Sequence, residues 1–101
     1  MRVSVYVPKI SEEKDKQVHG RLRALFCTHA GGFTIYPSCT GHWLDDKEQE
    51  VIDHVVVYET YAQEDKENLL LKNLAVELLV IRELLNQDSI AYTIDNQIYF
   101  I

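Results

Sequence analysis

The feature that most constrains the fold is the order in which two kinds of hydrophobic periodicity follow one another. Residues 2–7 (RVSVYV) alternate in a way that is typical of a strand, and apolar residues then recur at helical spacing. Residues 33–39 (FTIYPSC) alternate again, and residues 51–61 (VIDHVVVYETY) have the β-branched and aromatic composition of a third strand. Residues 64–87 predict the longest helix, because leucines and isoleucines recur there at three- and four-residue steps.

The remaining segments complete a known plan. Residues 89–94 and 97–101 flank Asp95-Asn96, which predicts a tight hairpin because both turn residues tolerate positive φ. The order strand, helix, strand, strand, helix, strand, with a short extra strand, is that of the ferredoxin-like βαββαβ plan. We therefore predict one α+β domain over residues 1–101, with two helices covering one face of an antiparallel sheet.

Local signals support these elements. Ser11 is the predicted N-cap of the first helix, and Gly31-Gly32 is its predicted stop, because glycine accepts the left-handed C-cap conformation. Pro37 lacks an N–H, so its strand is expected at a sheet edge or at a bend. The polar residues 40–50 predict a loop or hairpin tip.

Composition excludes several classes of protein. The formal net charge of −6 argues against general nucleic-acid binding, which depends on lysine and arginine. The most apolar segment, residues 69–85, contains Lys72, Glu77 and Arg82, so we expect no membrane span. No basic region followed by an apolar run opens the chain, and the two cysteines form no disulfide framework, so we expect a cytoplasmic protein with free thiols.

Cysteine and histidine occur together in one short segment, in the pattern Cys27-x-His29, nine residues, Cys39-x-x-His42. A zinc site would need all four side chains within about 2.0–2.3 Å of one ion. The predicted strand between the pairs would separate them by roughly 20 Å. We therefore expect no single-ion metal site, while two-ligand sites completed by another subunit stay open, and Cys27 is expected to be a buried apolar residue.

No other segment carries a specific catalytic or binding motif. The sequence contains no P-loop, no G-x-G-x-x-G and no G-x-S-x-G, so we expect no cofactor. The acidic residues between 45 and 53 lack the spacing of an EF-hand and are interpreted as a solvated hairpin tip.

The face of the sheet opposite the helices is the most informative surface. Alternation assigns to it an aromatic and hydrogen-bonding set: Ser4, Tyr6, Thr34, Tyr36, His54, Val56, Tyr58 and Thr60. Tyrosine is typical of interfaces, because it joins an apolar ring to a polar tip. The candidate ligand-binding or interface residues are Tyr6, Thr34, Tyr36, Trp43, His54 and Tyr58. Two interpretations stay open, an oligomer interface and a ligand surface with His54 as the titratable group.

Residues 25–61 resemble the long hairpin of the PII signalling and CutA-type trimers. In this chain an edge strand runs into Trp43, an acidic turn and the apolar strand VIDHVVVYETY, and Trp43 is the one landmark that matches those proteins. The resemblance implies a shared architecture and oligomerisation, and the nucleotide-binding loop signature of PII proteins is not found in this chain. Dimeric α+β-barrel proteins, including small monooxygenases, share the same plan, so the fold alone does not assign a function.

We therefore predict a small cytoplasmic homo-oligomer, a dimer or a trimer, that binds a small molecule or a protein partner in a regulatory role. One alternative is a cofactor-free enzyme of the dimeric α+β-barrel type, with His54 as its acid or base. Another is an acidic protein that inhibits a macromolecular partner through residues 45–53.

Overall fold

The computed structural model describes all residues from 1 to 101 and contains five strands, two helices and one short 3-10 turn. The strands are β1 (Arg2–Pro8), β2 (Thr34–Leu44), β3 (Glu50–Tyr61), β4 (Ala91–Ile94) and β5 (Gln97–Phe100). The helices are α1 (Glu12–Ala30) and α2 (Glu67–Leu84), and the turn η1 (Glu64–Lys66) precedes α2. The predicted order of elements is confirmed.

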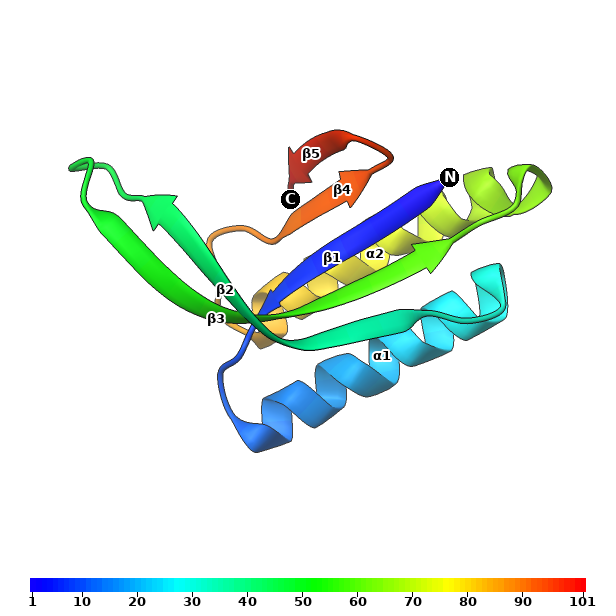
Figure 1. The fold of residues 1–101 in the computed structure, drawn as a ribbon. Helices are drawn as coiled ribbons and strands as arrows, with labels where there is room; N and C mark the ends of the chain where they lie inside the picture. Colours follow the sequence, from blue (N-terminus) through cyan, green and yellow to red (C-terminus); the bar gives the residue numbers. More distant parts are fainter.

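The five strands form one antiparallel sheet in the order β2-β3-β1-β4-β5. Both helices pack against the same face of this sheet, as Figure 1 shows. The first four strands in that order, with two helices on one face, are the ferredoxin-like arrangement, and β5 adds a fifth strand at the edge beside β4. The α+β, ferredoxin-like prediction is therefore confirmed.

The hydrophobic core lies between the sheet and the two helices. Val3, Val5 and Val7 supply the centre of its sheet side, because alternate residues of β1 point toward the helices. The helix side comes from two apolar stripes at three- and four-residue spacing: Val18, Leu22, Leu25 and Phe26 on α1, and Leu70, Leu74, Leu78 and Ile81 on α2. The opposite face of the sheet has no helix over it, and we call it the open face.

The ends of α1 follow the predicted local chemistry. The Ser11 hydroxyl accepts a hydrogen bond from the Lys14 N–H at 3.2 Å, which satisfies one of the free donors of the first turn. Gly31 ends the helix at φ 81°, and its N–H donates to the Cys27 carbonyl at 3.2 Å.

Strand β2 is longer than its predicted range of 33–39 and continues through part of the predicted loop to Leu44. Its pairing with β3 shifts register between Tyr36 and Cys39, so Pro37 lies at an irregularity in an edge strand, as predicted. Only Val55 and the β3 residues after it pair with β1. Residues 40–54 are therefore a two-stranded ribbon that projects from the body of the sheet (Figure 1), and we call this segment the arm.

The C-terminal hairpin forms as predicted around Asp95, which has φ 54°. Tyr92 of β4 and Tyr99 of β5 are directly paired, and their rings stack with centroids 5.5 Å apart. Neither helix combines the length and the apolar character that crossing a membrane requires.

Candidate functional site

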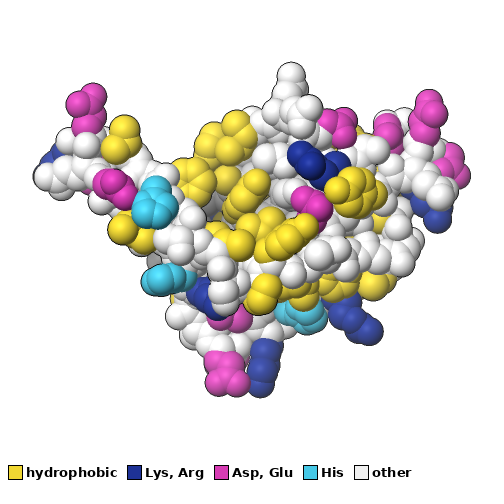
Figure 2. Space-filling model, viewed as in Figure 1, with side chains coloured by type: hydrophobic (Ala, Val, Ile, Leu, Met, Phe, Trp, Pro, Cys, Tyr) yellow, Lys and Arg dark blue, Asp and Glu magenta, His cyan; other side chains and the backbone are white.

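The open face is assembled from residues that pair across neighbouring strands, because directly opposed residues point to the same side of a sheet. Tyr6 of β1 pairs with Val57 of β3 and with Ala91 of β4, and Val57 pairs with Tyr36 of β2. Figure 2 shows hydrophobic side chains gathered over the middle of this side of the molecule, beside the arm and its acidic tip. The paired residues at the centre of the open face are therefore apolar and aromatic.

A groove lies on the open face where the arm leaves the body of the sheet. It has a volume of about 300 Å³. Its lining comes from β1, the arm, β3, the segment between α2 and β4, β4 and β5: Tyr6, Pro8, Trp43, Leu44, Asp45, Val51, Asp53, Val55, Gln87, Asp88, Ser89, Ala91 and Phe100. Val55 is buried although it lies on this face. The groove is thus a concave, partly apolar site of the kind that holds small ligands.

Three aromatic side chains line this groove: Tyr6, Trp43 and Phe100. The position of Trp43 depends on a glycine in the same strand. Trp43 extends over Gly41, two residues before it on the same side of the arm, and a Cβ built on Gly41 would lie 2.8 Å from Trp43 Nε1. The indole can adopt this position only because residue 41 has no side chain. Tyr6 is half-buried, and Phe100 is 62% exposed. Flat rings of this kind can stack on a ligand or face a cation.

The charged residues of the groove are all acidic, namely Asp45, Asp53 and Asp88. One oxygen of Asp45 accepts hydrogen bonds from the Lys47 and Gln49 N–H groups at 2.9 Å each, so this carboxylate also shapes the turn of the arm. Asp53 and Asp88 form no ion pair and no side-chain hydrogen bond in the structure, and they remain available to a ligand. A groove with carboxylates and aromatic rings favours a positively charged ligand with a flat apolar part.

A second polar cluster lies on the open face around the Glu59 carboxylate. Ser4 Oγ donates a hydrogen bond to Glu59 Oε2 at 3.1 Å. The hydroxyls of Tyr36 and Tyr61 approach Oε1 at 3.5 Å and 3.3 Å. Glu59 is half-buried, and its carboxylate lies within hydrogen-bond distance of three hydroxyls. This cluster places one carboxylate within hydrogen-bond distance of two tyrosine hydroxyls.

Five of the six candidate residues were predicted on the open face, and the structure places three of them there. Tyr6, Thr34 and Tyr36 lie on the open face, and Trp43 lies on the same side of the arm. Only Tyr6 and Trp43 reach the groove, whereas Tyr36 belongs to the Glu59 cluster. Their roles in binding or assembly stay a prediction.

The predicted face of β3 is wrong by one residue. Tyr58 pairs with Val5 and Ile35, so it points toward the helices together with Val56 and Thr60, and Val55 and Val57 take the open face instead. His54 falls on the same side of the strand as Tyr58, is exposed, and lines no groove. The physical reason is that β3 has apolar side chains on both faces, so alternation within the strand does not decide between them.

Tyr58 belongs to an aromatic cluster beneath the sheet. Its ring stacks on Phe33 with centroids 6.0 Å apart, and its hydroxyl lies 3.3 Å from His19 Nδ1, within hydrogen-bond distance. Burial raises the pKa of the Tyr58 phenol above its ordinary value of 10.0, and the nearby Asp15 carboxylate raises this pKa further. Tyr58 and His19 therefore connect α1 to the sheet.

The cysteine and histidine pattern is distributed over separate elements. Cys27 lies near the end of α1 and is exposed, so the expectation that it is buried is wrong. Cys39 and His42 lie in β2, and the strand expected between the two pairs is present. His42 Nδ1 is 2.6 Å from Glu50 Oε1 across the arm. The absence of a shared zinc ion stays a prediction.

Sequence reasoning did not place Asp53, Asp88 or Glu59 in the site, and it interpreted Asp53 as part of a solvated hairpin tip. The signal for Asp53 and Glu59 was their position within an otherwise apolar strand, since a carboxylate there must lie at a surface. For Glu59 the one-residue error in β3 hid this signal, because it assigned the residue to the helix side. Asp88 follows α2, and no local pattern indicates that its segment returns to the open face.

Comparison with known proteins supports the fold. No protein-family model matches the chain, and no curated protein sequence matches it either. Among solved structures, the chain is similar to a phage SAM lyase in complex with S-methyl-5'-thioadenosine, with a TM-score of 0.65 and 13% identity over 99% of this chain and 87% of that one. It is also similar to the divalent cation tolerance protein CutA1 from Thermus thermophilus, with a TM-score of 0.54 and 16% identity over 100% and 82% of the two chains. The predicted resemblance to CutA-type proteins in plan is confirmed.

Proposed function

We propose that this chain forms a homo-oligomer that binds a small, positively charged or nucleoside-derived molecule in the open-face groove, in a regulatory role in the cytoplasm. The observation that carries the proposal is the composition of the groove. Three aromatic side chains and three carboxylates meet there without any lysine or arginine. A ligand that combines a flat ring with a cationic group would satisfy both kinds of side chain.

Self-association is supported by apolar surface that this chain leaves uncovered. On the open face, Tyr36, Ile98 and Phe100 are all exposed. The arm exposes apolar side chains on both sides, with Trp43 and Val51 on one and Leu44 and Ile52 on the other. A two-stranded ribbon is marginally stable in water by itself, so contact with further copies would stabilise the arm and enclose the groove.

The class of ligand can be narrowed with the solved neighbours. One of them is a SAM lyase that holds S-methyl-5'-thioadenosine. SAM combines an adenine ring with a sulfonium and an ammonium group, which is the combination that rings and carboxylates favour. SAM and S-methyl-5'-thioadenosine are therefore the first ligands to test. Both contain the adenine ring and only SAM carries positive charge, so comparing their affinities separates the contribution of the charge from that of the ring.

A second candidate function is inhibition of a basic macromolecule by the arm. Its tip carries Asp45, Asp46, Glu48 and Glu50 against Lys47, and these side chains are exposed. Complementary charge would accelerate the encounter with a basic partner. The enzyme alternative through His54 has less support, because His54 is outside the groove and the Glu59 cluster.

Tryptophan fluorescence gives a direct test of the proposed function, because Trp43 is the only tryptophan of the chain and lines the groove. We expect SAM to change its emission saturably, and S-methyl-5'-thioadenosine to do so with lower affinity. A Tyr6→Ala variant should weaken both responses, whereas a Thr28→Ala variant on α1, far from the open face, should leave them unchanged. Emission that neither compound alters would contradict the proposed ligand class.

A further inference from the structure

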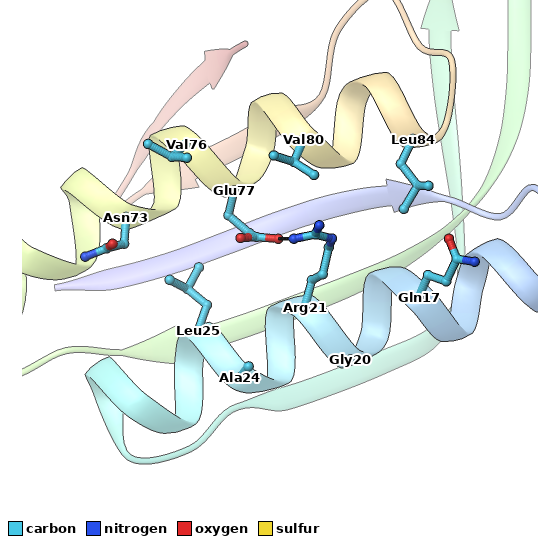
Figure 3. A pocket seen from close by; sticks show the side chains of 10 residues that line it. All are labelled: Gln17, Gly20, Arg21, Ala24, Leu25, Asn73, Val76, Glu77, Val80 and Leu84. Carbon is cyan, nitrogen blue, oxygen red and sulfur yellow. Dashed lines mark hydrogen bonds and ion pairs between the residues drawn. The ribbon is translucent and has the colours of Figure 1, made fainter.

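A second concave surface lies between α1 and α2, on the side of the molecule away from the sheet. Figure 3 shows it as a groove with α1 along one wall and α2 along the other. Its volume is about 660 Å³. Gly20 and Ala24 form the low wall on α1, and Val76, Val80 and Leu84 form the apolar wall on α2. This surface takes no part in the open-face groove.

Gly20 has no explanation within this chain. It lies inside α1, where glycine weakens a helix relative to alanine. A Cβ built on Gly20 would meet no atom within 4 Å, so the packing of this chain leaves room for a side chain. Without a side chain at residue 20, another molecule can approach the backbone of α1 closely from outside.

An ion pair crosses the middle of the same groove. Figure 3 shows the Arg21 side chain of α1 paired with Glu77 of α2. Arg21 Nη1 lies 2.8 Å from Glu77 Oε1, and the Arg21 side chain is 45% exposed. Arg21 has five N–H donors, and this contact uses only one of its nitrogens. Arg21 can therefore donate further hydrogen bonds to a second carboxylate at the centre of the groove.

The α2 wall rises into solvent beside this pair. Val76 is 61% exposed, and Leu69, seven residues earlier and so on the same side of the helix, is 56% exposed. One side of the groove is thus an apolar ridge and the other side is a hollow over Gly20 and Ala24. A surface with a ridge and a matching hollow is complementary to a copy of itself.

We propose that a second copy of this chain docks on the α1–α2 groove about a two-fold axis that runs parallel to the two helices. Such an axis places α2 of each copy over α1 of the other, so that Val76 and Val80 enter the hollow at Gly20 and Ala24. The charged groups of Arg21 and Glu77 lie at the same height along the helices, since they form an ion pair. The axis therefore brings Arg21 of each copy beside Glu77 of the other, and four alternating charges meet at the centre. This contact is on the opposite side of the molecule from the open face and does not rest on the proposed function.

The first test fills the hollow. A Cβ at residue 20 meets no atom within 4 Å, and the rest of a leucine side chain in Gly20→Leu would extend into the open groove, so the fold should be kept and circular dichroism should be unchanged. Light scattering should report a mass about half that of the wild-type protein at equal concentration. Arg23→Leu, which adds leucine to α1 at an exposed position outside the groove, should keep the wild-type mass. A folded Gly20→Leu variant with the wild-type mass would overturn the proposal.

The second test uses the charges and does not depend on the first. Arg21→Glu makes the groove centre acidic, and Glu77→Arg makes it basic, so each variant alone should lose the contact through repulsion between like charges. An equimolar mixture should recover the wild-type mass, because acidic and basic copies alternate across the axis. Recovery cannot come from the pair within one chain, which both variants lack. A mixture that stays at the lower mass, or single variants that keep the wild-type mass, would refute reciprocal pairing.

Discussion

The indole of Trp43 lies over Gly41, close enough that a Cβ on residue 41 would come within 2.8 Å of Nε1. We expect Gly41→Ala to displace the indole from the groove, since the Cβ would meet the ring itself rather than the end of a flexible chain. The emission of Trp43 should shift, and SAM should bind more weakly. Gly32→Ala is the matched control, because a Cβ at Gly32 meets no atom within 4 Å. Unchanged emission in Gly41→Ala would contradict this position of the indole.

The carboxylates of the groove should select for charge. Asp53→Asn keeps the shape of the side chain and removes its charge, so the affinity for SAM should fall about fivefold, equivalent to about 1 kcal/mol. The affinity for the uncharged S-methyl-5'-thioadenosine should change little. Asp46→Asn, at the tip of the arm and outside the groove lining, is the control. Calorimetric titration measures each affinity, and equal losses for both ligands would mean that Asp53 does not act through its charge.

The stability of the protein should depend on Tyr58 in alkaline solution. The pKa of this phenol is raised in the folded protein above its ordinary value of 10.0, so the folded state holds the proton more tightly than the unfolded chain does. The stabilisation is fully present below about pH 10 and is lost as pH rises through the folded-state pKa. Tyr58→Phe should therefore flatten the decline of the free energy of unfolding above that pH, measured by urea denaturation at several pH values. An identical decline in both proteins would exclude this role for Tyr58.

The N-cap of α1 should be a measurable part of its stability. Ser11→Ala removes the acceptor of the Lys14 N–H and should lower the free energy of unfolding by about 1 kcal/mol. Ser11→Asp should keep most of the free energy of unfolding that the cap contributes, because a carboxylate also accepts this hydrogen bond and is favoured near the positive end of a helix. Ser89→Ala, at an exposed position outside the helices, provides the comparison for urea denaturation. A Ser11→Ala variant as stable as wild type would show that the cap is dispensable.

The predictable part of this fold is the part that short-range chemistry decides. Ser11 and Gly31 mark the ends of α1 because N-caps and left-handed C-caps are local choices. Alternation assigns the residues of β1 to the correct faces, because the buried Val3, Val5 and Val7 alternate with polar or amphipathic residues. The position of Pro37 at a register shift of an edge strand is also a local effect, because proline has no N–H to donate to a neighbouring strand.

The remaining part depends on partners that are distant in sequence. Tyr58 points toward the helices because it pairs with Val5, more than fifty residues away. On that side its ring contacts the rings of His19 and Phe33. The arm extends to Leu44 although residues 40–44 have the composition of a polar loop, because β3 supplies a partner for each of them. The groove joins Asp53 and Asp88 from segments that no sequence pattern connects, so its acidic character appears only in the folded chain.

Native mass spectrometry in the presence of SAM tests the central claim most directly, since one spectrum reports the number of copies and the bound ligand together. The account predicts a mass that is a multiple of the 11.7 kDa chain, with SAM bound, and less bound SAM in the Asp53→Asn variant at the same ligand concentration. A single chain of 11.7 kDa without bound SAM, across micromolar protein concentrations, would contradict both the homo-oligomer and the ligand site.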